Sequence, residues 1–70
     1  MAEHRITIKA ARVNAGLSQS EAAEKSGVGM RSLQRIERGQ VIPRWDVVVK
    51  LAKLYRWPTY LLNIGGSRDA

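Results

Sequence analysis

The sequence has no cysteine, a single histidine and no apolar run longer than a few residues. Without cysteine, neither a disulfide framework nor a thiolate metal site can form. The apolar runs are far shorter than the roughly 20 residues of a membrane-spanning helix. The N-terminal Met-Ala-Glu-His-Arg-Ile also lacks the apolar region of a secretory signal. We therefore expect a cytoplasmic protein that does not span a membrane.

Side chains suited to catalysis or metal binding are scarce as well. The histidine, His4, stands near the N-terminus, where we expect an exposed polar role. No Asp–His pair is available to activate a serine, and no cluster of His, Asp and Glu suggests a metal site. The glycines are dispersed as helix stops and form no phosphate-binding loop. The sequence thus predicts that the protein is not an enzyme and needs no cofactor or metal.

The charge is strongly basic for so short a chain. Seventy residues allow one domain with one small core, and 12 Lys and Arg against 6 Asp and Glu give a formal net charge of +6. Such a surface attracts nucleic acid or anionic lipid, although a small basic protein can also be merely soluble. Residues 29–44 concentrate arginine against a single acid, Glu37. These arginines are Arg31, Arg35, Arg38 and Arg44.

Helix start and stop signals divide the chain into short helices, whereas the only strand-like alternation, at residues 5–8, is too short to anchor a sheet. Ser18 and Glu21 form a Ser-x-x-Glu capping box, and Pro58 suits the first position of a last helix. The expected helices are about 7–15, 18–26, 29–38, 44–55 and 59–64. We therefore expect an all-α, compact five-helix domain over residues 1–64, followed by a short flexible tail at 65–70.

The third expected helix is amphipathic. Leu33 and Ile36 are three positions apart and should face the core. Its other face then carries mostly basic and polar side chains, which suits a helix laid in a DNA groove. These outward positions are Met30, Arg31, Gln34, Arg35 and Arg38.

A series of short motifs also carries a family resemblance. They are Arg12, Gly16-Leu17-Ser18-Gln19, Ala22-Ala23, Gly27-Val28, Ile36-Glu37-Arg38-Gly39 and Pro43. In order and spacing they resemble the lambda-repressor/Cro-type (XRE-like) helix-turn-helix family over about residues 6–62. The most specific part is Leu-Ser-Gln followed some twenty residues later by Ile-Glu-Arg-Gly. The resemblance implies a lambda-repressor-like fold whose third helix enters the major groove of double-stranded DNA.

The resemblance implies base contacts from the start of the third helix, namely from Met30, Arg31, Gln34 and Arg35. An arginine can fork onto guanine O6 and N7, and Met30 would meet a thymine methyl group. Other interpretations stay open. Met30 could belong to the core, Arg31 and Arg35 could be solvated surface charge, and Arg35 could contact only phosphate.

Contacts to the DNA backbone are implied for Ser18, Gln19, Arg38, Gln40 and Arg44. Gln19 stands at the start of the second helix, where free N–H groups and the helix dipole favour a phosphate. Alternatively, it is a plain surface glutamine. The loop before Arg44 is about one residue shorter than in some relatives, which leaves a minor-groove contact by Arg44 open.

In related proteins an arginine of the first helix pairs with a glutamate late in the third, and the corresponding residues here are Arg12 and Glu37. Periodicity also favours a half-buried Glu37, because it follows Ile36 and lies four residues after Leu33. We expect this pair to be structural and to hold the first helix against the third.

Two departures from the family pattern concern helix starts: Gly29 stands where Ser or Thr usually caps the third helix, and Trp57-Pro58 replaces an aliphatic residue and Ser. The aromatic residues concentrate in the C-terminal part, where small relatives often dimerise. They serve either the core or a dimer interface. Candidate interface residues are Trp57, Tyr60, Leu61 and Ile64.

These observations predict a sequence-specific DNA-binding transcriptional regulator. One reading helix covers a short half-site, so we expect a repressor that binds a palindromic operator as a homodimer. Alternatives are an antitoxin or a restriction–modification controller protein that regulates its own operon, with a toxin or antirepressor as protein partner. A protein-interaction module without DNA binding is a further alternative, which the exposed arginines disfavour.

Overall fold

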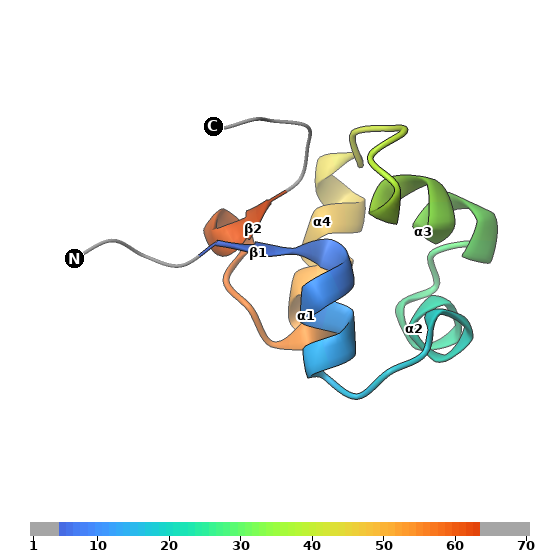
Figure 1. Ribbon diagram of the computed structural model, residues 1–70, viewed down its shortest axis with the longest axis horizontal. Coiled ribbons are helices and arrows are strands. Elements are labelled where there is room, and N and C mark those ends of the chain that lie inside the picture. Colours follow the sequence, from blue (N-terminus) through green and yellow to red (C-terminus); the bar gives the residue numbers. More distant parts are fainter. Residues whose placement is uncertain (1–4, 64–70) are drawn as a thin grey trace.

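The structure, a computed structural model, describes residues 5–63, so the expected tail at 65–70 lies outside the described residues. Within them the chain is mostly helical, as predicted (Figure 1). In chain order the elements are β1 (Ile6–Thr7), α1 (Ile8–Asn14), α2 (Gln19–Ser26), α3 (Met30–Glu37), α4 (Trp45–Tyr55), the 3₁₀ helix η1 (Thr59–Leu61) and β2 (Leu62–Asn63). None of the helices in this part of the chain has the length and apolarity needed to cross a bilayer.

The expectation of a fifth α-helix over residues 59–64 is wrong. Only Thr59–Leu61 form a single 3₁₀ turn, and the chain is extended at Leu62, with φ −80° and ψ 127°. Leu62 is 4% exposed and pairs in parallel with Ile6, so residues 5–8 do contribute a strand, although one of only two residues. Burial of Leu62 and pairing with β1 therefore outweigh the local helix signal.

The helices begin in two different ways. At α1, Thr7 Oγ1 accepts the N–H three residues further on at 3.0 Å. At α2, Ser18 Oγ accepts from the Glu21 N–H at 3.1 Å, while Glu21 Oε1 accepts from the Ser18 N–H at 2.9 Å. In contrast, α3 and α4 follow Gly29 and Arg44, and no side chain among the described residues caps them. Their starts must be fixed by packing.

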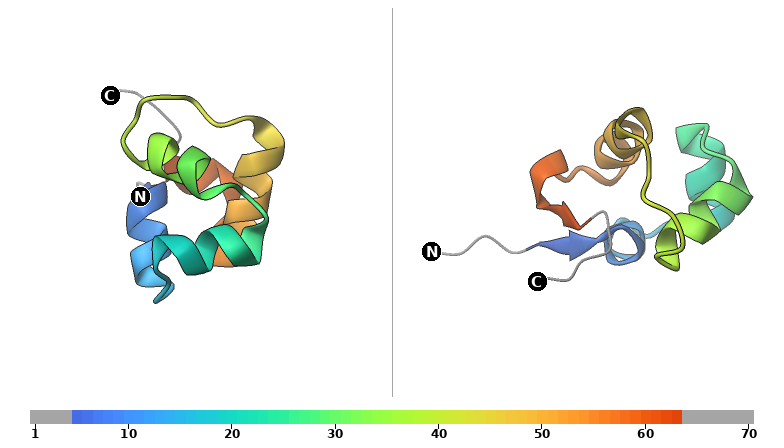
Figure 2. Two further views of the ribbon diagram at one scale, coloured as in Figure 1. Left: turned by 90° about the vertical axis from the view of Figure 1, so that its right-hand side faces the viewer. Right: turned by 90° about the horizontal axis from the view of Figure 1, so that it is seen from above.

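The core joins all four α-helices. α4 packs against α1 and α2, and α2 packs against α3, beside which it lies in both views of Figure 2. Alanines that are 0% exposed, Ala11 and Ala22, let neighbouring helices approach closely. The core residues are Ile8, Ala11, Ala22, Val28, Leu33, Ile36, Val48, Leu51, Ala52, Tyr55 and Leu62. Since α3 contributes two of them, its inner face is held in a defined orientation.

A left-handed residue follows each of the four α-helices, at Gly16, Gly27, Gly39 and Arg56. Gly27 has φ 80° and donates its N–H to the Ala23 carbonyl at 3.0 Å, which stops α2 and leads into the turn before α3. At the end of α4 the same role falls to Arg56, with φ 63°. This conformation costs a residue with a side chain about 1 kcal/mol. The α2–turn–α3 unit therefore has a turn that glycine fits without strain.

Candidate nucleic-acid interface

α3 has one face in the core and one in solvent. Leu33 is fully buried and Ile36 is 9% exposed. The outer face holds the side chains expected to read bases: Met30 (39% exposed), Arg31 and Arg35 are exposed, and Gln34 is half-buried. Arg31 and Arg35 are four positions apart and so lie one turn from each other on the same stripe. The exposed placement of Met30 does not fit the interpretation as a core residue.

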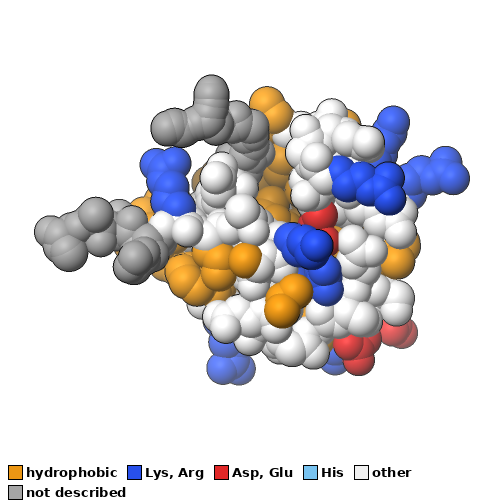
Figure 3. Space-filling view, viewed as in Figure 1, with side chains coloured by type: hydrophobic (Ala, Val, Ile, Leu, Met, Phe, Trp, Pro, Cys, Tyr) orange, Lys and Arg blue, Asp and Glu red, His pale blue; other side chains and the backbone are white. Residues whose placement is uncertain are grey.

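The surroundings of α3 are basic. Figure 3 shows Lys and Arg side chains projecting from the side of the molecule where α3 and the following loop lie. Arg38, Gln40 and Arg44, expected to contact the DNA backbone, are all exposed. Arg44 Nε lies 3.5 Å from Asp46 Oδ1, but both side chains are largely solvated, so this contact neutralises little of the charge. The arrangement can attract a polyanion to the outer face of α3.

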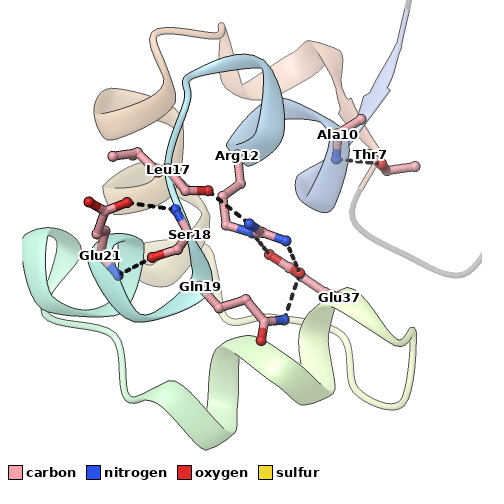
Figure 4. A network of polar contacts seen from close by, with 8 residues as sticks. All are labelled: Thr7, Ala10, Arg12, Leu17, Ser18, Gln19, Glu21 and Glu37. Atoms are coloured by element: carbon pink, nitrogen blue, oxygen red, sulfur yellow. Dashed lines mark hydrogen bonds and ion pairs between the residues drawn. The ribbon is translucent and has the colours of Figure 1, made fainter.

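Behind this face lies an ion pair between α1 and α3 (Figure 4). Arg12 Nε is 2.8 Å from Glu37 Oε2, and Arg12 Nη2 donates to Glu37 Oε1 at 3.2 Å. Arg12 Nη1 also donates to the Leu17 carbonyl at 2.8 Å. The hydrogen bond to Glu37 raises the pKa of Arg12, although burial opposes this. Arg12 is therefore protonated, and its hydrogen bonds tie the end of α3 to α1 and to the turn before α2.

Gln19, the first residue of α2, takes part in the same network. Its Nε2 donates to Glu37 Oε1 at 2.9 Å, so the amide predicted to approach the DNA backbone is bound to Glu37 in the unbound protein (Figure 4). The sequence analysis missed this link. The available signal was a carboxylate with more acceptor sites than one guanidinium can fill.

Ser18, also expected to approach the backbone, has its N–H and its hydroxyl oxygen engaged in the capping box with Glu21. The hydrogen bond from the Ser18 N–H, helped by the Ser18 side chain, lowers the pKa of Glu21 below its ordinary value of 4.5. Glu21 is thus ionised at neutral pH, and its negative charge stabilises the N-terminus of α2 through the helix dipole. The Ser18 hydroxyl proton stays available for donation.

The candidate dimer residues differ in exposure. Tyr60 is 63% exposed, whereas Trp57 and Leu61 are half-buried, and Trp57 packs against the core. Ile64 lies outside the described residues. The structure also exposes other apolar side chains, among them Val13 (59%), Val41 (39%), Ile42 (73%) and Trp45 (62%).

Between residues 5 and 63, no three His, Cys, Asp or Glu side chains gather as they would around a metal ion. The polar groups that do converge are those of the Arg12–Glu37–Gln19 network, where the guanidinium and the amide already occupy the carboxylate. These hydrogen bonds link α1, α2 and α3 to one another.

Comparison with known proteins gives two matches. The family model for the Helix-turn-helix domain matches residues 5–62. The HTH-type transcriptional regulator ImmR of Bacillus subtilis (strain 168) is 45% identical over 57 residues, which are 80% of this chain and 45% of that protein. The chain therefore spans less than half the length of this relative. No solved structure matches the chain significantly.

Proposed function

Because the chain belongs to the helix-turn-helix domain family, we propose that it is a sequence-specific DNA-binding transcriptional regulator. The observation that carries the proposal is the division of α3 into two faces. Its inner face is anchored by Leu33, Ile36 and Glu37, while Arg31 and Arg35 stand free on the outer face. Regulators of this family are non-enzymatic, and the similar ImmR is named as a transcriptional regulator.

In this proposal α3 lies in the major groove and its outer face reads base edges. Arg31 and Arg35 each donate two hydrogen bonds to a guanine, which is worth about 1–3 kcal/mol of discrimination per base. Gln34 pairs with an adenine edge, and the exposed side chain of Met30 covers a thymine methyl group. These four residues set the sequence preference.

The backbone contacts supply affinity and orientation. Gln19 and the Ser18 hydroxyl approach one phosphate at the N-terminus of α2, where the helix dipole is favourable. Arg38, Gln40 and Arg44 approach phosphates beyond the end of α3. Neutralising phosphates releases counterions, so binding weakens as salt rises.

We further propose that two chains bind a palindromic operator as a homodimer and act as a repressor in the cytoplasm. A single reading helix covers a short half-site, and two-fold symmetry doubles it. Trp57, Tyr60, Leu61 and Ile64 are the proposed interface, supported by the strong exposure of Tyr60. A toxin or antirepressor as additional partner is tested by pull-down from the native host.

Selection of binding sites from random DNA at a stated salt concentration tests the proposal. We expect a palindromic motif, and a loss of about 5–150-fold in affinity from each of Arg31→Ala and Arg35→Ala. Lys50→Ala and Lys53→Ala, each made singly, are the matched control, because each removes one positive charge from an exposed position of α4. If no sequence is enriched and the two arginine variants bind as the control does, α3 is not a reading helix.

A further inference from the structure

Tyr55, the last residue of α4, contains an unusual polar atom. Among residues 5–63, its hydroxyl is the single buried side-chain oxygen or nitrogen without a hydrogen-bond partner, and the residue is 3% exposed. A buried hydroxyl without a partner is unfavourable, so such groups are rare and call for a reason. Phenylalanine would fill the same space without this cost.

Tyr55 lies beside the segment that Arg12 binds. Tyr55 and Leu17 line the same surface pocket, and the Leu17 carbonyl accepts a hydrogen bond from Arg12. Burial, followed by the charge of Glu37, raises the pKa of Tyr55 to about 12, while Arg12 opposes this. The phenol is therefore neutral at physiological pH and keeps a proton to donate.

Glu37 is the group that could use this proton. Its carboxylate accepts from Arg12 through two nitrogens and from Gln19 through one, and its side chain is 3% exposed. A carboxylate has about four acceptor positions, so one stays available. Since water hardly reaches Glu37, a donor that leaves must be replaced from within the protein or the carboxylate loses a hydrogen bond.

We propose that Tyr55 is a positioning residue for DNA binding, whose hydroxyl replaces Gln19 as a donor to Glu37 when the Gln19 amide turns to the DNA backbone. This inference rests on the proposed function, because it needs the Gln19–phosphate contact. In the unbound protein Gln19 donates to Glu37 and the Tyr55 hydroxyl has no hydrogen-bond partner. On DNA the exchange keeps Glu37 fully bonded, so α3 stays anchored while Gln19 is free to bind.

A double-mutant cycle of Tyr55→Phe and Gln19→Ala tests the exchange through two measurements, thermal stability without DNA and affinity for the selected site. Alone, Tyr55→Phe should leave the melting temperature unchanged or raise it, because the hydroxyl has no partner, but weaken DNA binding about five- to tenfold. With Gln19→Ala, the hydroxyl already serves Glu37 in the free protein. There Tyr55→Phe should lower stability and weaken binding no further.

Equal effects of Tyr55→Phe in both backgrounds, on either measurement, would overturn the exchange. The wild type offers an independent check through the ¹³Cζ NMR resonance of Tyr55, which should shift on DNA binding as the hydroxyl becomes a donor. An unmoved resonance in the DNA complex argues against the proposal even if the Phe variant does not fold. Absence of sequence-specific binding by the wild type would instead refute the proposed function, while the stability cycle still reports on the Tyr55–Glu37 contact.

Discussion

α2 and α3 have eight residues each and are held in opposite ways. α2 has a complete capping box at Ser18, an acidic residue in its first turn and a lysine in its last turn, but Ala22 is its one buried residue. α3 has none of these at its start, where Gly29 is the cap. Instead, its inner face is buried through Leu33 and Ile36 and bonded through Glu37.

The difference separates local from tertiary stabilisation. α2 is stabilised by groups within its own first turn, so its start is defined before it packs. α3 depends on other helices, which leaves its N-terminal N–H groups and outer face without competing side chains. These N–H groups are therefore available to an external acceptor such as a phosphate.

The strongest way to break this comparison is to remove the tertiary anchor of α3. Glu37→Ala strands the buried Arg12 charge and should lower the free energy of unfolding by about 3–5 kcal/mol. Gln34→Ala, on the outer side of the same helix, should change it by no more than about 0.5 kcal/mol. Urea unfolding measures both. Small and equal effects would show that the Arg12–Glu37 pair does not anchor α3.

The local anchor of α2 is tested by Ser18→Ala. Loss of the cap should lower the free energy of unfolding by about 1 kcal/mol, since the Glu21 N–H loses its acceptor. Ser20→Ala is the matched control, because Ser20 is exposed within α2 and alanine is the better helix former there. If both serine variants unfold at the same urea concentration, the capping box adds nothing to stability.

Giving α3 the cap it lacks sharpens the comparison. Gly29 has φ −60° and ψ 145°, and an added Cβ would meet only Ser32 Oγ at 3.9 Å, so serine fits. Gly29→Ser should raise stability by a few tenths of a kcal/mol, because its hydroxyl accepts a hydrogen bond from an N–H group of α3. Gly27→Ser, in the left-handed conformation at φ 80°, should destabilise instead. Thermal melts compare the two variants, and a destabilised Gly29→Ser would contradict the prediction.

The smallest effect on stability is expected from protonation of Glu21 at acidic pH. The pKa of Glu21 is lowered in the folded protein, so its contribution is present above about pH 4.5, its ordinary value, and is lost as the pH falls through the lower folded value. Glu21→Gln removes this titrating group. Thermal melts between neutral and acidic pH should therefore show a difference between wild type and variant that shrinks below pH 4.5. A difference that is constant with pH would show that Glu21 does not act through its charge.

Most element positions followed from local signals in the sequence. The capping box, the glycine stops and the Pro58 break depend on neighbouring residues, and α2 at Gln19–Ser26 lies within the predicted 18–26. The region after Pro58 was mispredicted because the conformation of Leu62 is decided by pairing with Ile6, at the other end of the described chain. No local pattern reports such a contact.

In the candidate site, too, contacts between residues far apart in the sequence could not be predicted from local patterns. Helical periodicity sufficed to place Arg31 and Arg35 outside and Leu33 inside. The hydrogen bond between Gln19 and Glu37, and the unpaired hydroxyl of Tyr55, depend on how three helices pack. These details need the side chains in space, since each residue type has several common partners elsewhere.

The short ladder of β1 and β2 has a practical consequence. Because Ile6 and Leu62 are paired, the described chain enters and leaves at one place, at the opposite end of the molecule from α3 (Figures 1 and 2). A fluorescent reporter, a surface anchor or a second domain joined directly to residue 5 or residue 63 would therefore start away from the proposed DNA-facing side. Fusions at the two ends should be interchangeable in a binding assay on immobilised protein.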